Sequence, residues 1–216
     1  MAASTEHERL LRLLDCRAIV DVGANRGQFA LAAHTLIPDA NIISFEPLAQ
    51  PVKKFRAVFN GTQKVRLCQV AIGPVRSTAE IHVSGRDDSS SLLPITELQN
   101  ELHPGTAEVG VEKVQVERLV DWLSVEEIIA PALLKLDVQG YELEALKGCQ
   151  ELLPYFAYLY AECAFIELYR GQAFANEVVT FLQERAFRLA GIYNLAHDKS
   201  GRAVQADFFF VNTITC

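Results

Sequence analysis

Short apolar runs alternate with amphipathic stretches along most of this chain. Five runs rich in β-branched or aromatic residues predict strands at residues 18–24, 41–46, 65–72, 132–138 and 156–163. Runs that are apolar on both faces are typical of strands inside a parallel sheet. Between them, apolar residues spaced three or four apart predict helices over residues 26–37, 48–59, 119–130 and 140–153. The alternation therefore predicts an α/β protein with a doubly wound sheet, whose ligands bind outside the carboxyl ends of its strands.

The C-terminal third changes this pattern. A predicted helix over residues 174–186 is followed by two strand-like runs, FRLAGIYN and ADFFFVN, which the polar turn His197–Arg202 joins. A parallel return would need a crossover of a dozen or more residues, so these strands must be antiparallel neighbours. We expect the sheet to end in an antiparallel pair.

The length and composition suit one domain. The chain has 216 residues, half of them hydrophobic, which is enough for a substantial core. One irregular stretch, residues 73–118, holds the polar segment RDDSSS between two strand-like runs, Ala79–Val83 and Val109–Val116. We predict a single domain over residues 1–216 with a small β-rich insertion at about 73–118.

Charge and cysteine usage restrict the partners and the compartment. The 27 Asp and Glu outnumber the 20 Lys and Arg, and no block of like charge reaches five residues. Nucleic-acid binding is therefore disfavoured, and the acidic balance fits a cationic cofactor or a neutral substrate better. The five cysteines form no CxxC pair, the first fifteen residues have no secretory apolar core, and eighteen apolar residues never run together. We expect a cytoplasmic protein with no disulfide framework, structural zinc site or membrane span.

The first predicted strand runs directly into a turn that contains glycine, DVGANRG at residues 21–27. Such glycines let a ligand approach the backbone at a helix N-terminus, although packing alone can also require them. A dinucleotide fingerprint counted from Gly23 needs glycine at positions 25 and 28, where this chain has Asn25 and Gln28. The Asn25 side chain would obstruct a pyrophosphate, so NAD and FAD are disfavoured.

Glu46 ends the second predicted strand, 19 residues after Gly27. An acid at this place can accept both hydroxyls of a ribose, and a solvated glutamate at a strand end is the alternative. A relaxed glycine turn together with a ribose acid favours a nucleoside ligand without a diphosphate. S-adenosylmethionine meets that description, and its sulfonium suits an acidic cleft.

Three more acids follow the central strands. Asp137 ends the fourth predicted strand, Glu142 begins the next helix, and Glu162 lies near the end of the fifth strand. Carboxylates on neighbouring strand ends can act as a general base, hold substrate hydroxyls or bind a divalent ion, and the sequence does not separate these roles. Glu142 is also explained as a first-turn acid that the helix dipole favours.

Several segments together resemble the FkbM-type methyltransferases. These are DVGANRGQF, SFEP, VAIG, SSSL at residues 89–92, LLKLDVQGYELEALKG and AECAFIELYRGQ, in this order, and the resemblance covers about residues 18 to 212. It implies a class I S-adenosylmethionine-dependent methyltransferase with a Rossmann-like, seven-stranded, mostly parallel sheet and an antiparallel last strand. Many members are O-methyltransferases of sugars or natural products. One departure is that the usual LDD-like element reads RLVDW at residues 118–122, which we interpret as a variation at a helix start.

The resemblance also implies roles for individual residues. Residues 21–27 would hold the methionine part of the cofactor, Glu46 the ribose and Ala71 the adenine, and Asp137 would lie near the transferred methyl group. The implied cofactor-binding residues are Asp21, Gly23, Ala24, Asn25, Gly27, Glu46, Pro47 and Ala71.

For catalysis we expect Asp137 or Glu162 to be the general base and the other to orient the acceptor. The expected substrate-binding residues are Ser90, Ser91, Glu142 and Tyr169, and no residue is assigned to a metal. His82 and His103 in the insertion are possible bases, although surface or packing roles explain them better.

The resemblance implies methylation of a hydroxyl on a sugar, a lipid or another small natural product. Two alternatives stay open: a noncatalytic scaffold that binds the cofactor, and a nicotinamide-dependent oxidoreductase, which the missing fingerprint disfavours.

Overall fold

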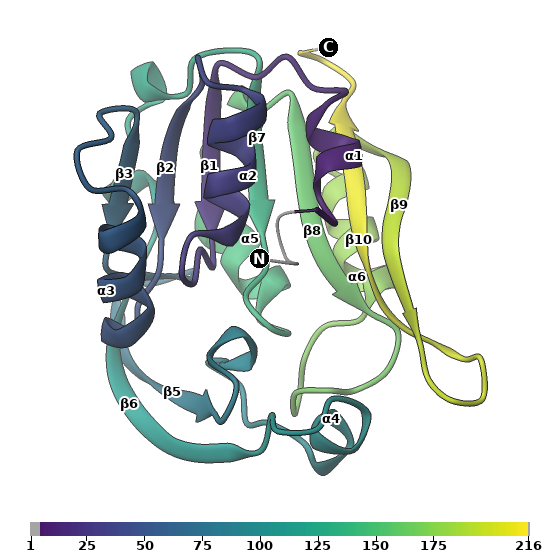
Figure 1. Cartoon of the computed structure of the whole chain (residues 1–216). Coiled ribbons are helices and arrows are strands. Elements are labelled where there is room, and N and C mark those ends of the chain that lie inside the picture. Colours follow the sequence, from purple (N-terminus) through teal and green to yellow (C-terminus); the bar gives the residue numbers. More distant parts are fainter. Residues whose placement is uncertain (1–4, 216) are drawn as a thin grey trace.

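The computed structural model describes residues 5–215, and its centre is a seven-stranded sheet (Figure 1). The strands lie in the order β3 (Val65–Cys68), β2 (Asn41–Phe45), β1 (Ala18–Val22), β7 (Ala132–Leu136), β8 (Tyr158–Ala164), β10 (Ala203–Asn212) and β9 (Phe187–His197). Neighbours from β3 to β8 are parallel, whereas β10 is antiparallel to both β8 and β9. The predicted α/β fold class and its antiparallel ending are confirmed.

Helices cover both faces of this sheet (Figure 1). One face carries α1 (Glu8–Leu11), α2 (Gln28–Leu36) and α3 (Ala49–Val58), and the other carries α5 (Glu142–Cys149) and α6 (Ala175–Gln183). Strand β1 packs in both directions, because Val20 faces the core beneath α5 and α6 while Ile19 packs with Phe29 of α2. Burial on both faces explains why the parallel strands have unbroken apolar sequences.

The prediction of a helix over residues 119–130 is wrong. This stretch forms two short 3-10 turns, η3 (Leu119–Asp121) and η4 (Val125–Glu127). The Ser124 backbone N–H bonds to the Glu127 carboxylate at 3.0 Å, so Ser124 caps a new turn instead of continuing the first one. The apolar spacing fits both arrangements. Leu119 and Leu123 are buried in the observed turns, and residues four apart would also lie on one face of a helix.

A smaller sheet lies beyond the carboxyl ends of the parallel strands (Figure 1). It has three strands in the order β4 (Ala71–Ile72), β6 (Glu108–Glu117) and β5 (Ser77–Ser84). The 3-10 turn η2 (Asp87–Ser89) and the short helix α4 (Glu97–Leu102) connect β5 to β6. The run predicted as one strand over residues 65–72 is thus divided between the two sheets.

The helices of residues 5–215 are short. None of them combines the length and the apolar character that crossing a membrane requires.

Candidate active site

A cavity of about 170 Å³ lies at the carboxyl ends of β1, β2 and β7. The small sheet and the segment after β5 close its other side. Many of the residues predicted from the sequence line this cavity: Gly23, Ala24, Asn25, Glu46, Pro47, Ala71, Ser90, Ser91 and Asp137. Residues far apart in the sequence therefore meet at the edge that the fold class predicts.

The glycine turn is required first by the packing of the chain itself. Gly23 and Gly27 have φ values of +81° and +87°, which L side chains rarely adopt. A Cβ atom on Gly23 would lie 1.8 Å from the Asp137 carbonyl oxygen, and one on Gly27 would lie 2.7 Å from the Phe59 ring. Packing therefore explains both glycines, and Gly27 does not line the cavity. Close approach of a ligand is not needed to account for them.

Glu46 is buried, with 6% of its surface exposed, and its carboxylate lines the cavity. Its Oε2 accepts the backbone N–H of Asn25 at 3.0 Å, and its Oε1 accepts that of Leu48 at 2.8 Å. Burial raises the pKa of Glu46 to about 7, although both hydrogen bonds act to lower it. Each carboxylate oxygen keeps a second lone pair, so the group can still accept two hydroxyl donors.

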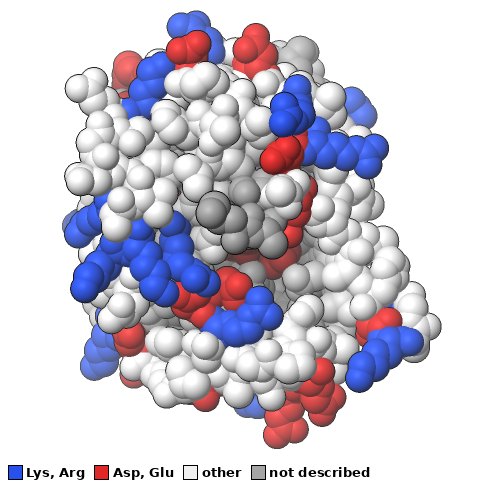
Figure 2. All heavy atoms as spheres, in the orientation of Figure 1, with Lys and Arg blue, Asp and Glu red and all other residues white. Residues whose placement is uncertain are grey.

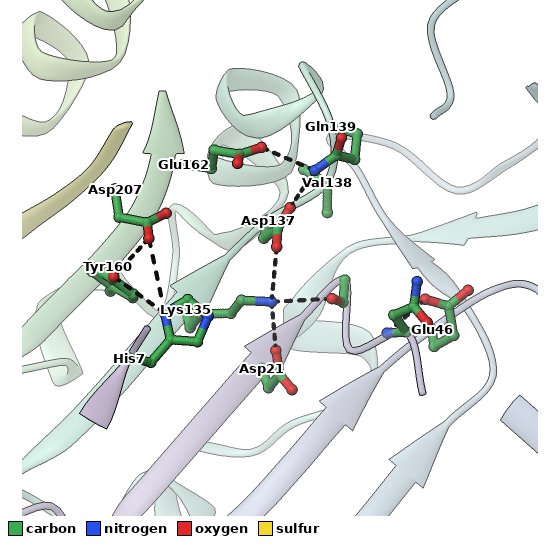
Figure 3. A network of polar contacts seen from close by, with 12 residues as sticks. His7, Asp21, Glu46, Lys135, Asp137, Val138, Gln139, Tyr160, Glu162 and Asp207 are labelled. Carbon is green, nitrogen blue, oxygen red and sulfur yellow. Dashed lines mark hydrogen bonds and ion pairs between the residues drawn. The ribbon is translucent and has the colours of Figure 1, made fainter. Parts of the chain in front are cut away.

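Asp21 does not line the cavity, and the structure assigns it a different partner. It is fully buried, and its Oδ1 lies 3.0 Å from Lys135 Nζ (Figure 3). Lys135 donates to the Gly23 carbonyl oxygen at 3.0 Å and lies 3.8 Å from Asp137 Oδ2. Burial alone would lower the pKa of Lys135, but the charges of Asp21 and Asp137 raise it above its ordinary value. Asp21 can therefore reach the cavity only through Lys135.

Sequence reasoning missed Lys135, although the signal was available. A lysine inside the otherwise apolar strand ALLKL is buried in the sheet and needs an acidic partner.

Gln139 connects the two acids that were predicted as catalytic. Its Nε2 donates to Asp137 Oδ1 at 2.7 Å and to Glu162 Oε2 at 2.9 Å (Figure 3). Its Oε1 accepts the Tyr169 hydroxyl at 2.6 Å. Burial, followed by the charge of Asp137, raises the pKa of Glu162 well above its ordinary value. Asp137 lines the cavity and Glu162 does not, so Glu162 is connected to the cavity through Gln139, a residue that sequence reasoning also missed.

Two residues predicted to bind substrate lie outside the lining of the cavity. Glu142 is buried, and its Oε1 accepts the backbone N–H groups of Val138 and Gly140 at 3.0 and 3.2 Å. Burial raises the pKa of Glu142 to about 7. Tyr169 is 2% exposed and supports Gln139. Both contact the loop after β7, and their direct contact with a substrate stays a prediction.

The two insertion histidines also lie away from the cavity lining. His82 Nδ1 lies 2.8 Å from Glu108 Oε2, and burial lowers the pKa of His103.

Residues 86–91, which we call the strap, border the cavity, and Asp87, Asp88, Ser90 and Ser91 belong to its lining. At one end, Asp87 lies 2.6 Å from Arg26 Nη2 and 2.8 Å from Lys54 Nζ, and its carbonyl oxygen accepts the Asn25 amide at 2.7 Å. At the other end, the Ser91 hydroxyl donates to the Gln139 carbonyl oxygen at 2.6 Å. Figure 2 shows basic side chains gathered beside acidic ones on the side of the molecule where α3 lies. The strap thus ties the glycine turn to the end of β7.

Within residues 5–215, no group of three or more His, Cys, Asp or Glu side chains is placed to hold a metal ion.

Residues 21–189 match the Methyltransferase FkbM domain. The chain belongs to the FkbM methyltransferase family. It is therefore an S-adenosylmethionine-dependent methyltransferase, as the resemblance in the sequence predicted. The match begins at Asp21, in the glycine turn, and ends within β9, so it includes every residue that the sequence analysis assigned to the site.

Individual relatives agree with this assignment. This FkbM methyltransferase is 26% identical to the 2-O-methyltransferase NoeI of Sinorhizobium fredii over 215 residues, which cover 96% of this chain and 85% of NoeI. It is 30% identical over 152 residues to Methyltransferase 1 of Beauveria bassiana, which cover 62% of this chain and 58% of that protein. Among solved structures, a precorrin-6y C5,15-methyltransferase of Geobacter metallireducens has a TM-score of 0.53 at 12% identity and covers 96% of this chain and 86% of its own. That structural likeness concerns the fold alone.

Proposed function

We propose that this methyltransferase binds S-adenosylmethionine in the cavity and methylates a hydroxyl oxygen of a small-molecule acceptor, with a sugar as the leading class. The name of the relative NoeI, a 2-O-methyltransferase that aligns along most of its length, supports oxygen as the acceptor atom. We also propose that residues 1–216 form one domain in which residues 73–118 are an insertion.

The observation that carries the cofactor assignment is the position of Glu46. Its buried carboxylate lines the cavity and keeps one lone pair on each oxygen, which suits two vicinal ribose hydroxyls. The backbone of Gly23, Ala24 and Asn25 borders the same space and would face the methionine part. Ala71, at the start of β4, would face the adenine.

When bound, the donor supplies an activated methyl group, so the chain has to align the acceptor and receive its proton. Asp137 is the predicted catalytic residue that lines the cavity, and it would contact the acceptor hydroxyls. Glu162 would support Asp137 through Gln139, and Ser90 and Ser91 of the strap would border the acceptor.

Calorimetry with S-adenosylmethionine, S-adenosylhomocysteine and NAD tests the cofactor assignment. We expect both sulfur ligands to bind, NAD not to bind, and Glu46→Ala to weaken binding by at least tenfold. A Glu46→Ala variant that binds the donor as tightly as the parent would refute the ribose assignment.

Incubation with donor carrying a labelled methyl group and a panel of methyl glycosides, lipid alcohols and peptides tests the acceptor class. We expect label in an acid-stable ether of a glycoside. Tight donor binding without transfer to any member of the panel would favour a noncatalytic scaffold.

A further inference from the structure

A histidine from the start of the chain lines the cavity. His7 directly precedes α1, and that helix is anchored by Leu10 and Leu11, each 1% exposed, in the core beneath α2. The His7 side chain is 11% exposed, and together with Glu6 it borders the same cavity as Glu46 and Asp137. Core packing of α1 therefore sets the position of this imidazole.

Polar groups of β8 and β10 lie beside the Nδ1 atom of the His7 ring (Figure 3). Its Nδ1 lies 3.3 Å from the Tyr160 hydroxyl of β8 and 3.8 Å from Asp207 Oδ2 of β10. The Tyr160 hydroxyl donates to Asp207 at 2.8 Å, and Asn194 of β9 donates to the same carboxylate at 2.7 Å. On the other side of the ring, Nε2 lies 3.3 Å from Glu6 Oε1. A proton taken up by this ring would therefore meet a carboxylate on each side.

The order of the strands places these groups on the acceptor side of the cavity. Glu46 follows β2, the glycine turn follows β1 and Asp137 follows β7, while Tyr160 and Asp207 lie on β8 and β10, the next strands in the same direction. The Phe29 ring links both parts, because its centre lies 5.2 Å from the His7 ring centre and 5.5 Å from Lys135 Nζ. A donor whose ribose lies at Glu46 would thus leave the side near His7 to the acceptor.

We propose that His7 takes the proton of the acceptor hydroxyl during methyl transfer and that Asp207 and Tyr160 position its ring. This inference rests on the proposed function. The hydroxyl oxygen forms the new bond to the methyl carbon, and the electron pair of the broken carbon–sulfur bond stays on sulfur. The hydroxyl proton moves to Nε2 of His7, from which the half-exposed Glu6 carboxylate turns away to admit the acceptor, and it leaves later to water. Asp137, which Glu162 supports through Gln139, then holds a neighbouring hydroxyl of the acceptor.

The carboxylates are less suited to this proton. Glu162 does not line the cavity, and burial and the charge of Asp137 raise its pKa well above the ordinary value. The Asp137 carboxylate already accepts from Gln139 and lies near the Lys135 cation. The ordinary pKa of an imidazole lies more than two units above that of a carboxylate, which suits a general base near neutral pH.

Nuclear magnetic resonance of the histidine rings tests the inference without an acceptor. The signals of His7 are assigned by their loss in His7→Gln and titrated with saturating S-adenosylmethionine or S-adenosylhomocysteine. The positive sulfonium should lower the His7 titration midpoint by roughly 0.5 pH unit or more relative to the uncharged thioether. The midpoint of His34, which lies on α2 and does not line the cavity, should not differ.

Equal His7 midpoints with both ligands bound would overturn the inference. Failure of both ligands to bind would overturn the proposed function and this inference with it.

Kinetics with a methylated glycoside from the panel give a second readout. His7→Gln should lower kcat by about 10² to 10⁴-fold and leave donor affinity within about twofold, and added imidazole should restore part of the rate to His7→Ala. His197→Gln, which changes an exposed histidine at the end of β9, should behave as the parent. A His7→Gln variant with parental kcat would overturn the inference. When no glycoside is methylated, the sugar assignment fails and the ring titration alone decides the role of His7.

Discussion

Lys135 Nζ lies 3.0 Å from Asp21 Oδ1 in the interior of the sheet, beneath the glycine turn. Both side chains are almost completely buried, at 4% and 0% exposure. The lysine also bonds to the Gly23 carbonyl oxygen, so this ion pair fixes the turn that borders the cofactor side of the cavity. A buried pair of this kind makes the stability of the fold depend on keeping both charges together.

The first prediction concerns this ion pair. Lys135→Met leaves the Asp21 carboxylate buried without its cation, so we expect it to lower the free energy of unfolding by about 3–5 kcal/mol. The double variant Asp21→Asn with Lys135→Met removes both charges and should recover most of that loss. Urea denaturation of the two single variants and the double variant measures the coupling.

The exposed pair of Lys64 with Asp39 supplies the matched control. Lys64→Met should change the free energy of unfolding by about 0.5 kcal/mol or less. A double variant as unstable as the sum of its single changes would show that Asp21 and Lys135 act independently.

The second prediction is a pH dependence of donor binding. Burial raises the pKa of Glu46 to about 7, so the carboxylate is mostly protonated at pH 6 and mostly ionised at pH 8. Because the ionised form accepts both ribose hydroxyls, the affinity for S-adenosylhomocysteine should rise by roughly tenfold from pH 6 to pH 8. Calorimetry across this range measures it.

Two variants locate the titrating group. Glu46→Gln should bind more weakly and lose the pH dependence. Glu142, whose pKa burial also raises to about 7, does not line the cavity, so Glu142→Gln should keep it. A parent protein with constant affinity over this range would contradict the role of the ionised Glu46.

Much of the fold was predictable because its causes are local. Apolar runs predicted the parallel strands, and the short turn at His197–Arg202 predicted the antiparallel pair. Glu46 and Asp137 were predictable because a strand end is itself a position in the fold. The helix expected over residues 119–130 failed because local spacing does not distinguish one helix from two 3-10 turns.

The missed features depend on partners that are distant in the sequence. Lys135 bonds to the backbone of Gly23, 112 residues away, and His7 meets Tyr160, 153 residues away. Gly148 is another case, because a Cβ atom there would lie 2.2 Å from the Gly73 carbonyl oxygen. The lysine inside the apolar strand ALLKL indicates that an acidic partner exists, but the sequence does not say which residue that partner is. The folded chain identifies these neighbours.

The third prediction concerns the strap. Asp87 is held by Arg26 and Lys54, two partly exposed ion pairs that together contribute on the order of 1 kcal/mol. Asp87→Asn should therefore speed the release of S-adenosylhomocysteine by roughly threefold to tenfold. Release from the parent should also quicken with added salt, because salt screens these pairs. Stopped-flow measurements of ligand release follow both effects.

Asp88→Asn is the control for the strap, since Asp88 pairs with Arg86 of the same segment and with no basic group across the cavity mouth among the pairs that the structure shows. Its release rate should match that of the parent. Equal release from the Asp87→Asn and Asp88→Asn proteins would mean that the strap does not limit ligand exit.

The fourth prediction is a pH dependence of stability from Glu142. Its pKa is raised from 4.5 to about 7 in the folded chain, so the folded state binds more protons than the unfolded state between these values. The free energy of unfolding must therefore fall as pH rises through this window, by up to about 3 kcal/mol at this site.

Glu142→Gln removes the titration, and its amide oxygen can still accept both backbone N–H groups. The stability gained by this variant, measured by urea denaturation, should thus be small at pH 5 and largest at pH 8, whereas Glu151→Gln on the exposed surface should show no such trend. Parallel stability curves for the parent and Glu142→Gln would mean that the buried carboxylate costs the fold nothing.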